Sequence, residues 1–240
     1  MGVQSSFGFT LGRMEKGRLN KITDVPGVRV GHVTRHEGDI NTGVTAILPH
    51  TGDMFHDKCP AASHVINGFG KSIGLVQVNE LGTIETPLLL TNTLSVGTAA
   101  TALVKYMLER NADIGCDTGT VNPMVFECND GHLNDIRGLH VTEQNALDAL
   151  ANAADDFEEG AVGAGSGMSC YSLKGGIGSA SRIFELYGNK YTVGALLLTN
   201  FGTLRDLTIG GERVGERLYQ KKEAEKAAAE QQDKGSVIII

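Results

Sequence analysis

The last four residues of the chain, Val237 to Ile240, are all apolar and β-branched, and they follow a segment of opposite character. Residues 212–234 hold six acidic and six basic side chains, which is typical of an exposed helix or a flexible linker. A run such as 237–240 would promote aggregation at an exposed sheet edge, so it predicts a buried central strand. Since the chain stops within that strand, we expect further residues to be needed beyond it.

The composition is that of a folded protein with one large domain or two small ones. Of the 240 residues, 41% are hydrophobic and 20% are charged. Lys and Arg number 21 against 28 Asp and Glu, and a net charge of −7 predicts no nucleic-acid or anionic-membrane partner. No signal-peptide pattern and no bilayer-spanning apolar stretch is visible. The four cysteines form no Cys-x-x-Cys pair, which indicates a reducing, cytoplasmic location.

Glycine is the outlier in this composition, with 32 residues, which predicts many tight turns. Helical spacing of apolar residues predicts one helix from an N-cap at Ser95 through Met107, and a second helix after Thr142. Short β-type runs predict strands at 28–30, 44–48, 74–78, 87–91 and 191–198. Helices and strands mix without an internal repeat, so the predicted fold class is α/β or α+β.

Two glycine-rich stretches, 163–168 and 174–179, raise the possibility of phosphate binding by backbone N–H groups. Neither has the spacing of a Walker loop or a dinucleotide fingerprint, so a buried turn is the favoured interpretation. His32 and His36 have the four-residue spacing of metal ligands, but they straddle a predicted strand boundary, and we expect no metal site. The polar cluster 127–135 fits a turn and a site about equally well, and a carboxylate there could bind an ammonium group.

The dipeptide Gly235-Ser236, between the charged segment and the apolar strand, is where a self-cleaving precursor would place its nucleophile. Glycine permits the strained backbone in which the Ser236 hydroxyl attacks the preceding carbonyl. Hydrolysis of the resulting ester would leave Ser236 as a new N-terminus. Its α-amine, with an ordinary pKa near 7.7 to 8.0, could then act as general base for its own hydroxyl.

Six stretches, which span nearly the whole chain, resemble the DmpA-like family of self-processing aminopeptidases. They are 22–33, 41–45, 90–94, 127–136, 160–168 and 174–182. The resemblance implies a four-layer αββα sandwich like that of the N-terminal nucleophile hydrolases. It also implies a precursor cut into two associated subunits, which removes N-terminal residues from small peptides, amides or esters without metal or cofactor.

The resemblance assigns roles to individual residues. Ser236 matches the family nucleophile, and Gly235 precedes it at the cleavage site. Asn200 is similar to the oxyanion-hole asparagine, whose amide would stabilise developing negative charge. Glu127 is similar to the carboxylate that holds the substrate's free amine. Asn129, a second candidate for substrate binding, stands where some members carry a tyrosine, which puts any tyrosine-assisted step in doubt.

The predicted organisation is therefore a single domain in which 1–235 form an α-subunit-like part, with 212–234 as an exposed linker. Residues 236–240 would begin a β-subunit-like strand, and by resemblance roughly a hundred further residues would complete both sheets. The expected partners are that missing segment, a small peptide or amino-acid amide substrate, and further copies of the chain in a homo-oligomer. By itself this chain is expected to be inactive. The alternative is a non-catalytic relative that keeps the fold and binds peptides or amino acids.

Overall fold

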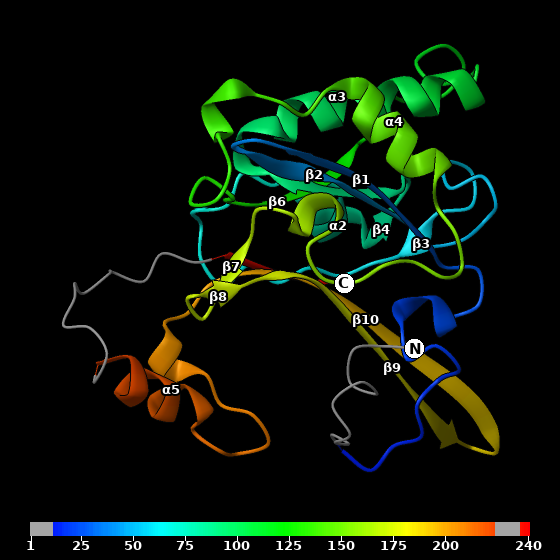
Figure 1. Cartoon of the computed structure of the whole chain (residues 1–240). Helices are drawn as coiled ribbons and strands as arrows, with labels where there is room; N and C mark the ends of the chain where they lie inside the picture. The colour runs from blue at the N-terminus through cyan, green and yellow to red at the C-terminus, as the bar shows by residue number, and fades with distance from the viewer. Residues whose placement is uncertain (1–11, 224–235) are drawn as a thin grey trace.

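The computed structural model describes residues 12–223 and 236–240, and its centre is two β-sheets that face each other (Figure 1). The first sheet has the strand order β1-β2-β5-β6. Its pairs are antiparallel except β5 with β6, which are parallel. The strands of this sheet are β1 (Arg29–Glu37), β2 (Ile40–Leu48), β5 (Leu88–Asn92) and β6 (Met124–Cys128). The predicted strands at 28–30, 44–48 and 87–91 are confirmed within them.

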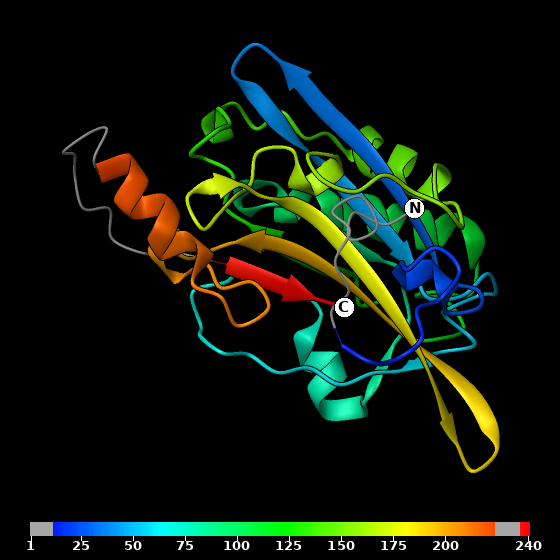
Figure 2. The same ribbon diagram turned by 60° about the horizontal axis from the view of Figure 1, so that its bottom comes forward.

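The second sheet has the order β11-β10-β9, and all its pairs are antiparallel. Long strands β9 (Gly176–Leu186) and β10 (Asn189–Asn200) form a hairpin that extends beyond the rest of the molecule (Figure 2). The strand predicted at 191–198 lies within β10. The short strand β11 (Ser236–Ile239) pairs with the C-terminal end of β10.

The main hydrophobic core lies between the two sheets. Leu88, Leu90 and Met124 contribute to it from the first sheet, and Leu196 and Leu198 from the second. All five side chains are buried. Because successive side chains of a strand point to opposite faces, Leu88 and Leu90 face this core while Leu89 faces the helices.

A second core lies between the first sheet and two helices, α3 (Val96–Arg110) and α4 (Glu143–Ala151). Helix α4 begins after Thr142 as predicted, and the Thr142 hydroxyl caps it by accepting a hydrogen bond from the Asn145 N–H. Ser95 is the N-cap residue of α3, as predicted, but its side chain makes no capping hydrogen bond. The Asn92 side chain accepts from the N–H groups of Leu94 and Ser95 instead, because a short 3₁₀ turn (Thr93–Ser95) precedes the helix.

The strand predicted at 74–78 is also wrong, because those residues form helix α2 (Leu75–Leu81). Gly74 and Gly82 flank the helix with φ of +101° and +65°, a conformation that glycine adopts readily. Val78 is buried but Val76 is exposed, a pattern that does not fit a strand with one buried face. Tertiary packing has overridden the β-propensity of the two valines.

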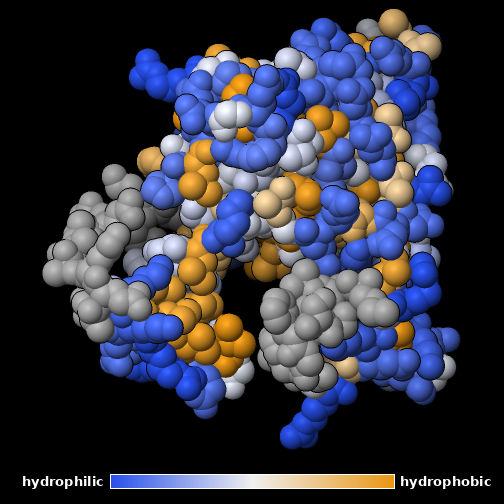
Figure 3. Space-filling view, viewed as in Figure 1, coloured by the Kyte–Doolittle hydropathy of each residue, from blue (hydrophilic) through white to orange (hydrophobic). Residues whose placement is uncertain are grey.

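The terminal apolar run forms strand β11, but among the described residues it lies at the edge of its sheet rather than at its centre. Ile238 and Ile240 pack against the core. Val237 and Ile239 point the other way, and Ile239 is 68% exposed. Within the described part of the chain, no helix covers that outer face. Figure 3 shows hydrophobic side chains along the hollow between this sheet and the neighbouring helix α5.

The remaining elements are short. They are the strands β3 (Cys59–Pro60), β4 (Thr83–Ile84), β7 (Ser169–Cys170) and β8 (Leu173–Lys174), the 3₁₀ turns at Ile22–Asp24, Ile136–Gly138, Gly163–Gly165 and Leu204–Asp206, and helix α5 (Val214–Glu223). Helix α5 occupies part of the charged segment 212–234, which agrees with the exposed-helix interpretation; residues 224–234 lie outside the described residues.

Candidate active site

The antiparallel register of β10 and β11 brings two sequence-predicted residues together. Asn200 is the last residue of β10, Ser236 is the first residue of β11, and the two are direct partners across the ladder. Residues paired in this way are nearest neighbours on adjacent strands. Gly235 and the side chain of Ser236 lie outside what the structure describes.

The side chain of Asn200 has a fixed orientation. Its Nδ2 donates a hydrogen bond of 2.6 Å to the backbone carbonyl oxygen of Asn129. A carbonyl oxygen can only accept, so the contacting atom must be the amide nitrogen. A side-chain amide nitrogen carries two hydrogens, and this contact uses one of them. The second N–H is left to donate to another acceptor.

Asn129 contributes its main chain to this arrangement. Its side-chain Oδ1 accepts a hydrogen bond of 2.8 Å from the Gly131 N–H, which closes an Asx turn. The turn keeps the Asn129 carbonyl directed at Asn200. The main-chain contact was not predicted, because a backbone group leaves no signature in residue types.

Glu127, two residues earlier at the end of β6, is a buried carboxylate with neutral donors only. It is 5% exposed. Its Oε1 accepts a hydrogen bond of 3.1 Å from the Lys71 N–H, and its Oε2 accepts one from the Thr93 hydroxyl. Among residues 12–223 and 236–240, Glu127 forms no ion pair. Since buried charges in proteins are normally paired, this site is complementary to a cation.

Glu127 lies on the face of β6 that points away from the core between the two sheets. Its neighbours Phe126 and Cys128 pack into the core between the sheets, so Glu127 projects from the opposite face. No hydrogen bond joins its side chain to Asn129 or Asn200 among the described residues.

Two further residues support the site: Asn92, which was missed from the sequence, and Asp130, which lies in the polar cluster 127–135. Asn92 caps the turn that carries Thr93, and its Nδ2 donates a hydrogen bond of 2.8 Å to the Thr42 hydroxyl. Asp130, fully buried beside Asn129, accepts a hydrogen bond of 3.0 Å from the Asn134 side chain. Burial raises the pKa of the Asp130 carboxyl. The sequence signal for Asn92 is its place before a helical pattern, which is typical of a cap. That this cap positions Thr93 beside Glu127 depends on the fold.

The first glycine-rich stretch forms a buried 3₁₀ turn, in agreement with the favoured interpretation. Gly163 has a φ of +53°, and a Cβ at this position would lie 2.4 Å from the Thr45 hydroxyl and 2.7 Å from His32 Nδ1. Only glycine fits such a close approach. The stretch therefore packs the turn onto β1 and β2.

His32 is held in this packing as a neutral imidazole. Its Nε2 lies 3.1 Å from the Glu158 carbonyl oxygen, which can only accept, so Nε2 carries the proton. Its Nδ1 lies 2.9 Å from the Thr45 hydroxyl, which itself accepts from the Ala164 N–H. His36 contacts the Asn41 side chain. No group of three metal-binding side chains occurs in the described ranges.

Burial lowers the pKa of His32 from 6.5 to about 4. The free energy of unfolding should therefore fall in acid, because the unfolded chain binds a proton at His32 more tightly than the folded protein does. The unfolded chain takes up the proton first as pH falls from 6.5 toward 4. The loss should therefore begin near pH 6.5 and reach about 3 kcal/mol below pH 4. Denaturant unfolding of the full-length protein at pH 7.5 and 4.5 measures it. A His32→Gln variant should lose less stability over this range than wild type, whereas a His36→Gln control should match wild type.

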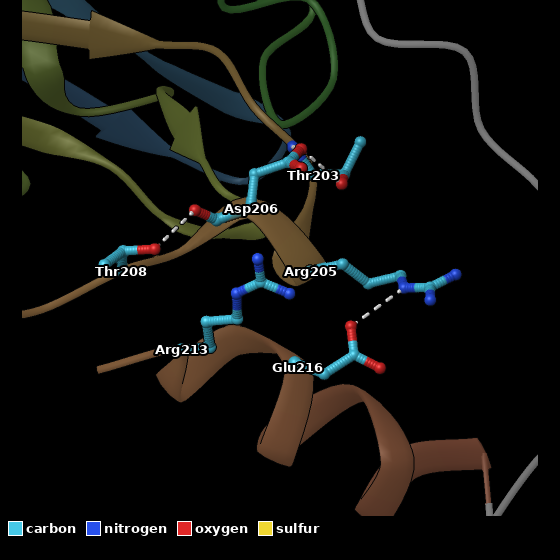
Figure 4. Close-up of a pocket in the computed structure, with 6 residues that line it drawn as sticks. All are labelled: Thr203, Arg205, Asp206, Thr208, Arg213 and Glu216. Atoms are coloured by element: carbon cyan, nitrogen blue, oxygen red, sulfur yellow. Dashed lines mark hydrogen bonds and ion pairs between the residues drawn. The ribbon is translucent and has the colours of Figure 1, made fainter. Parts of the chain in front are cut away.

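A separate polar hollow of about 540 Å³ lies beyond the end of β10 (Figure 4). It is lined by Thr203, Arg205, Asp206, Thr208, Arg213 and Glu216. The Arg205 guanidinium pairs with the Glu216 carboxylate at 3.2 Å, and Asp206 accepts from the Thr203 hydroxyl at 2.7 Å. The Arg205–Glu216 pair joins the Leu204–Asp206 turn to α5, and the Thr203–Asp206 hydrogen bond caps the turn itself.

A search of the described residues for a helix long and apolar enough to cross a bilayer finds none.

Two facing sheets with helices on one outer side define a sandwich of the N-terminal nucleophile hydrolase type, and solved structures agree. A Pyrococcus horikoshii protein, PH0078, superposes with a TM-score of 0.89 at 56% identity, over 91% of this chain and 64% of that one. The L-aminopeptidase D-Ala-esterase/amidase of Ochrobactrum anthropi, described as a new variant of the Ntn hydrolase fold, superposes with a TM-score of 0.85 at 34% identity, over 98% and 66%.

The chain belongs to peptidase family S58, whose model matches residues 20–240. A curated relative, the β-peptidyl aminopeptidase BapA of Sphingosinicella microcystinivorans, is 41% identical over 215 residues. That alignment covers 85% of this chain and 53% of the relative. The chain thus spans about half the length of this relative.

Proposed function

We propose that this chain is the larger part of a self-processing serine aminopeptidase. The observation that carries the proposal is the register of β10 and β11, in which Ser236 pairs with Asn200. Ser236 is the nucleophile, the free N–H of the Asn200 amide stabilises the oxyanion, and Glu127 binds the substrate's ammonium group. The names of the relatives, which are aminopeptidases, agree with this assignment.

The proposed processing step is an N-to-O acyl shift. The Ser236 hydroxyl oxygen attacks the Gly235 carbonyl carbon, the C–N bond between the residues breaks, and the nitrogen takes up the hydroxyl proton. Water then hydrolyses the ester, giving a Gly235 carboxylate and a Ser236 with free α-amine and hydroxyl. An oxyanion forms in both steps, and a fixed amide donor beside Ser236 stabilises it.

In the proposed hydrolysis, the freed α-amine takes the hydroxyl proton of Ser236 as the oxygen attacks the substrate carbonyl. The leaving amine receives that proton, and water hydrolyses the acyl-enzyme. Glu127 directs the reaction to N-terminal residues, because their α-ammonium group lies close to the bond to be cleaved and can pair with the buried carboxylate. Asn129 positions the Asn200 amide through its carbonyl oxygen.

The proposed enzyme needs chain beyond these 240 residues. The outer face of the second sheet exposes Val193, Val237 and Ile239, and apolar surface of this kind calls for a covering layer. We propose that a β-subunit-like segment covers it, that the 240-residue chain by itself is inactive, and that the complete protein is a cytoplasmic homo-oligomer acting on small peptides or amino-acid amides.

Intact mass spectrometry of the full-length gene product tests this function. We expect two species, one ending at Gly235 and one beginning at Ser236, and release of p-nitroaniline from amino-acid p-nitroanilides. A single uncut mass that persists for days at neutral pH would contradict the proposal. Binding of amino-acid amides without turnover would then favour the non-catalytic relative.

A further inference from the structure

The buried carboxylate of Glu127 is held by two chain segments, and each of them carries an exposed apolar side chain. The two groups that hold it, the Lys71 N–H and the Thr93 hydroxyl, come from separate segments. Phe69, two residues before Lys71, is 76% exposed, and Leu94, next to Thr93, is 52% exposed. An unpaired carboxylate held by two segments that each expose a large apolar side chain can offer a ligand both charge and apolar surface.

The segment that carries Phe69 is fixed by short contacts. The Asn67 side chain accepts a hydrogen bond of 3.1 Å from the Phe69 N–H. The Lys71 ammonium donates at 2.6 Å to the Phe69 carbonyl oxygen and lies 3.8 Å from the centre of the Phe69 ring. The Gly70 backbone runs close to the carboxylate, since a Cβ there would lie 3.8 Å from Glu127 Oε1.

Leu94 is equally constrained. Its N–H donates a hydrogen bond of 3.1 Å to Asn92 Oδ1, within the capped turn that delivers the Thr93 hydroxyl to Glu127. The positions of Phe69 and Leu94 are thus set by the same backbone that holds the carboxylate.

We propose that Phe69 and Leu94 select the side chain of the substrate's N-terminal residue. The ammonium group pairs with Glu127, and an apolar side chain on the same carbon lies against these two residues. This preference rests on the proposed function, since it assigns the specificity of that site. Acidic N-terminal residues are disfavoured because they place a carboxylate beside Glu127, whereas apolar ones gain from the removal of hydrophobic surface from water.

The test compares Phe69→Ala and Leu94→Ala with wild type in the full-length protein, using leucine and glycine p-nitroanilides. Each variant should lower kcat/KM for the leucine substrate about tenfold, mainly through KM, and change the glycine value less than about twofold. Phe69→Leu should restore much of the leucine preference. Val76→Ala, at an exposed apolar position on α2, is the matched control and should change neither value.

A binding readout separates this inference from the proposed catalysis. Leucinol and ethanolamine carry the same ammonium group with and without the apolar side chain, and neither can be hydrolysed. Calorimetry should show tighter binding of leucinol in wild type and loss of that difference in Phe69→Ala. Equal effects on both ligands and on both substrates, or no effect on either, would overturn the inference. A protein that keeps the leucinol preference without any turnover would overturn the proposed catalysis alone.

Discussion

Replacing Ser236 by alanine in the full-length protein should leave a single uncleaved chain with no detectable release of p-nitroaniline. Alanine keeps the backbone of β11 and its pairing with β10 but removes the only oxygen that can form the proposed ester. Both reactions depend on that oxygen, so both should be lost together. Intact mass after several days at neutral pH, with a p-nitroanilide assay on the same sample, measures the two effects.

Ser236→Thr is the matched control for this substitution, since it keeps a hydroxyl at the same position and should process slowly. Wild-type circular dichroism and melting temperature would show that each variant is folded. Two results would exclude Ser236 as the nucleophile. One is an alanine variant that is still cleaved between residues 235 and 236, and the other is an uncleaved alanine variant that still hydrolyses substrate.

Asn200→Ala should lower kcat for hydrolysis by about 10²–10³-fold and slow processing by a similar factor, because the variant lacks the proposed oxyanion donor. KM should change little, since the donor acts on charge that develops only in the transition state. Steady-state kinetics on a leucine p-nitroanilide, together with a processing time course, measures both. Asn200→Asp, which has the same shape but no N–H donor, should be as slow as the alanine variant.

Asn189→Ala is the control for Asn200, because it changes the same residue type at the opposite end of β10. It should leave both rates unchanged. If Asn200→Asp retained wild-type kcat, the amide would not be the oxyanion donor, and the contact with the Asn129 carbonyl would be purely structural.

The residue pattern within a segment was enough to predict those helices and strands that bury one face. The apolar spacing up to Met107 and after Thr142 predicted α3 and α4, and a β-type run predicted β10, because each of these elements buries one face against a layer of the core. The pattern at 74–78 failed because it is short and because two flanking glycines permit a helix that packing then selects.

The sequence by itself determined the family, through six motifs distributed along the chain, and with it the mixed α/β class and the candidate residues Ser236, Asn200, Glu127 and Asn129. The tertiary structure decided which of these meet. In the structure, Ser236 pairs with Asn200 across adjacent strands. The carbonyl oxygen of Asn129 fixes the orientation of the Asn200 amide. Glu127 projects from the face of β6 that points away from the core between the sheets. These relations depend on strand register and backbone groups from distant segments, and neither leaves a signature in the residue types of a single segment.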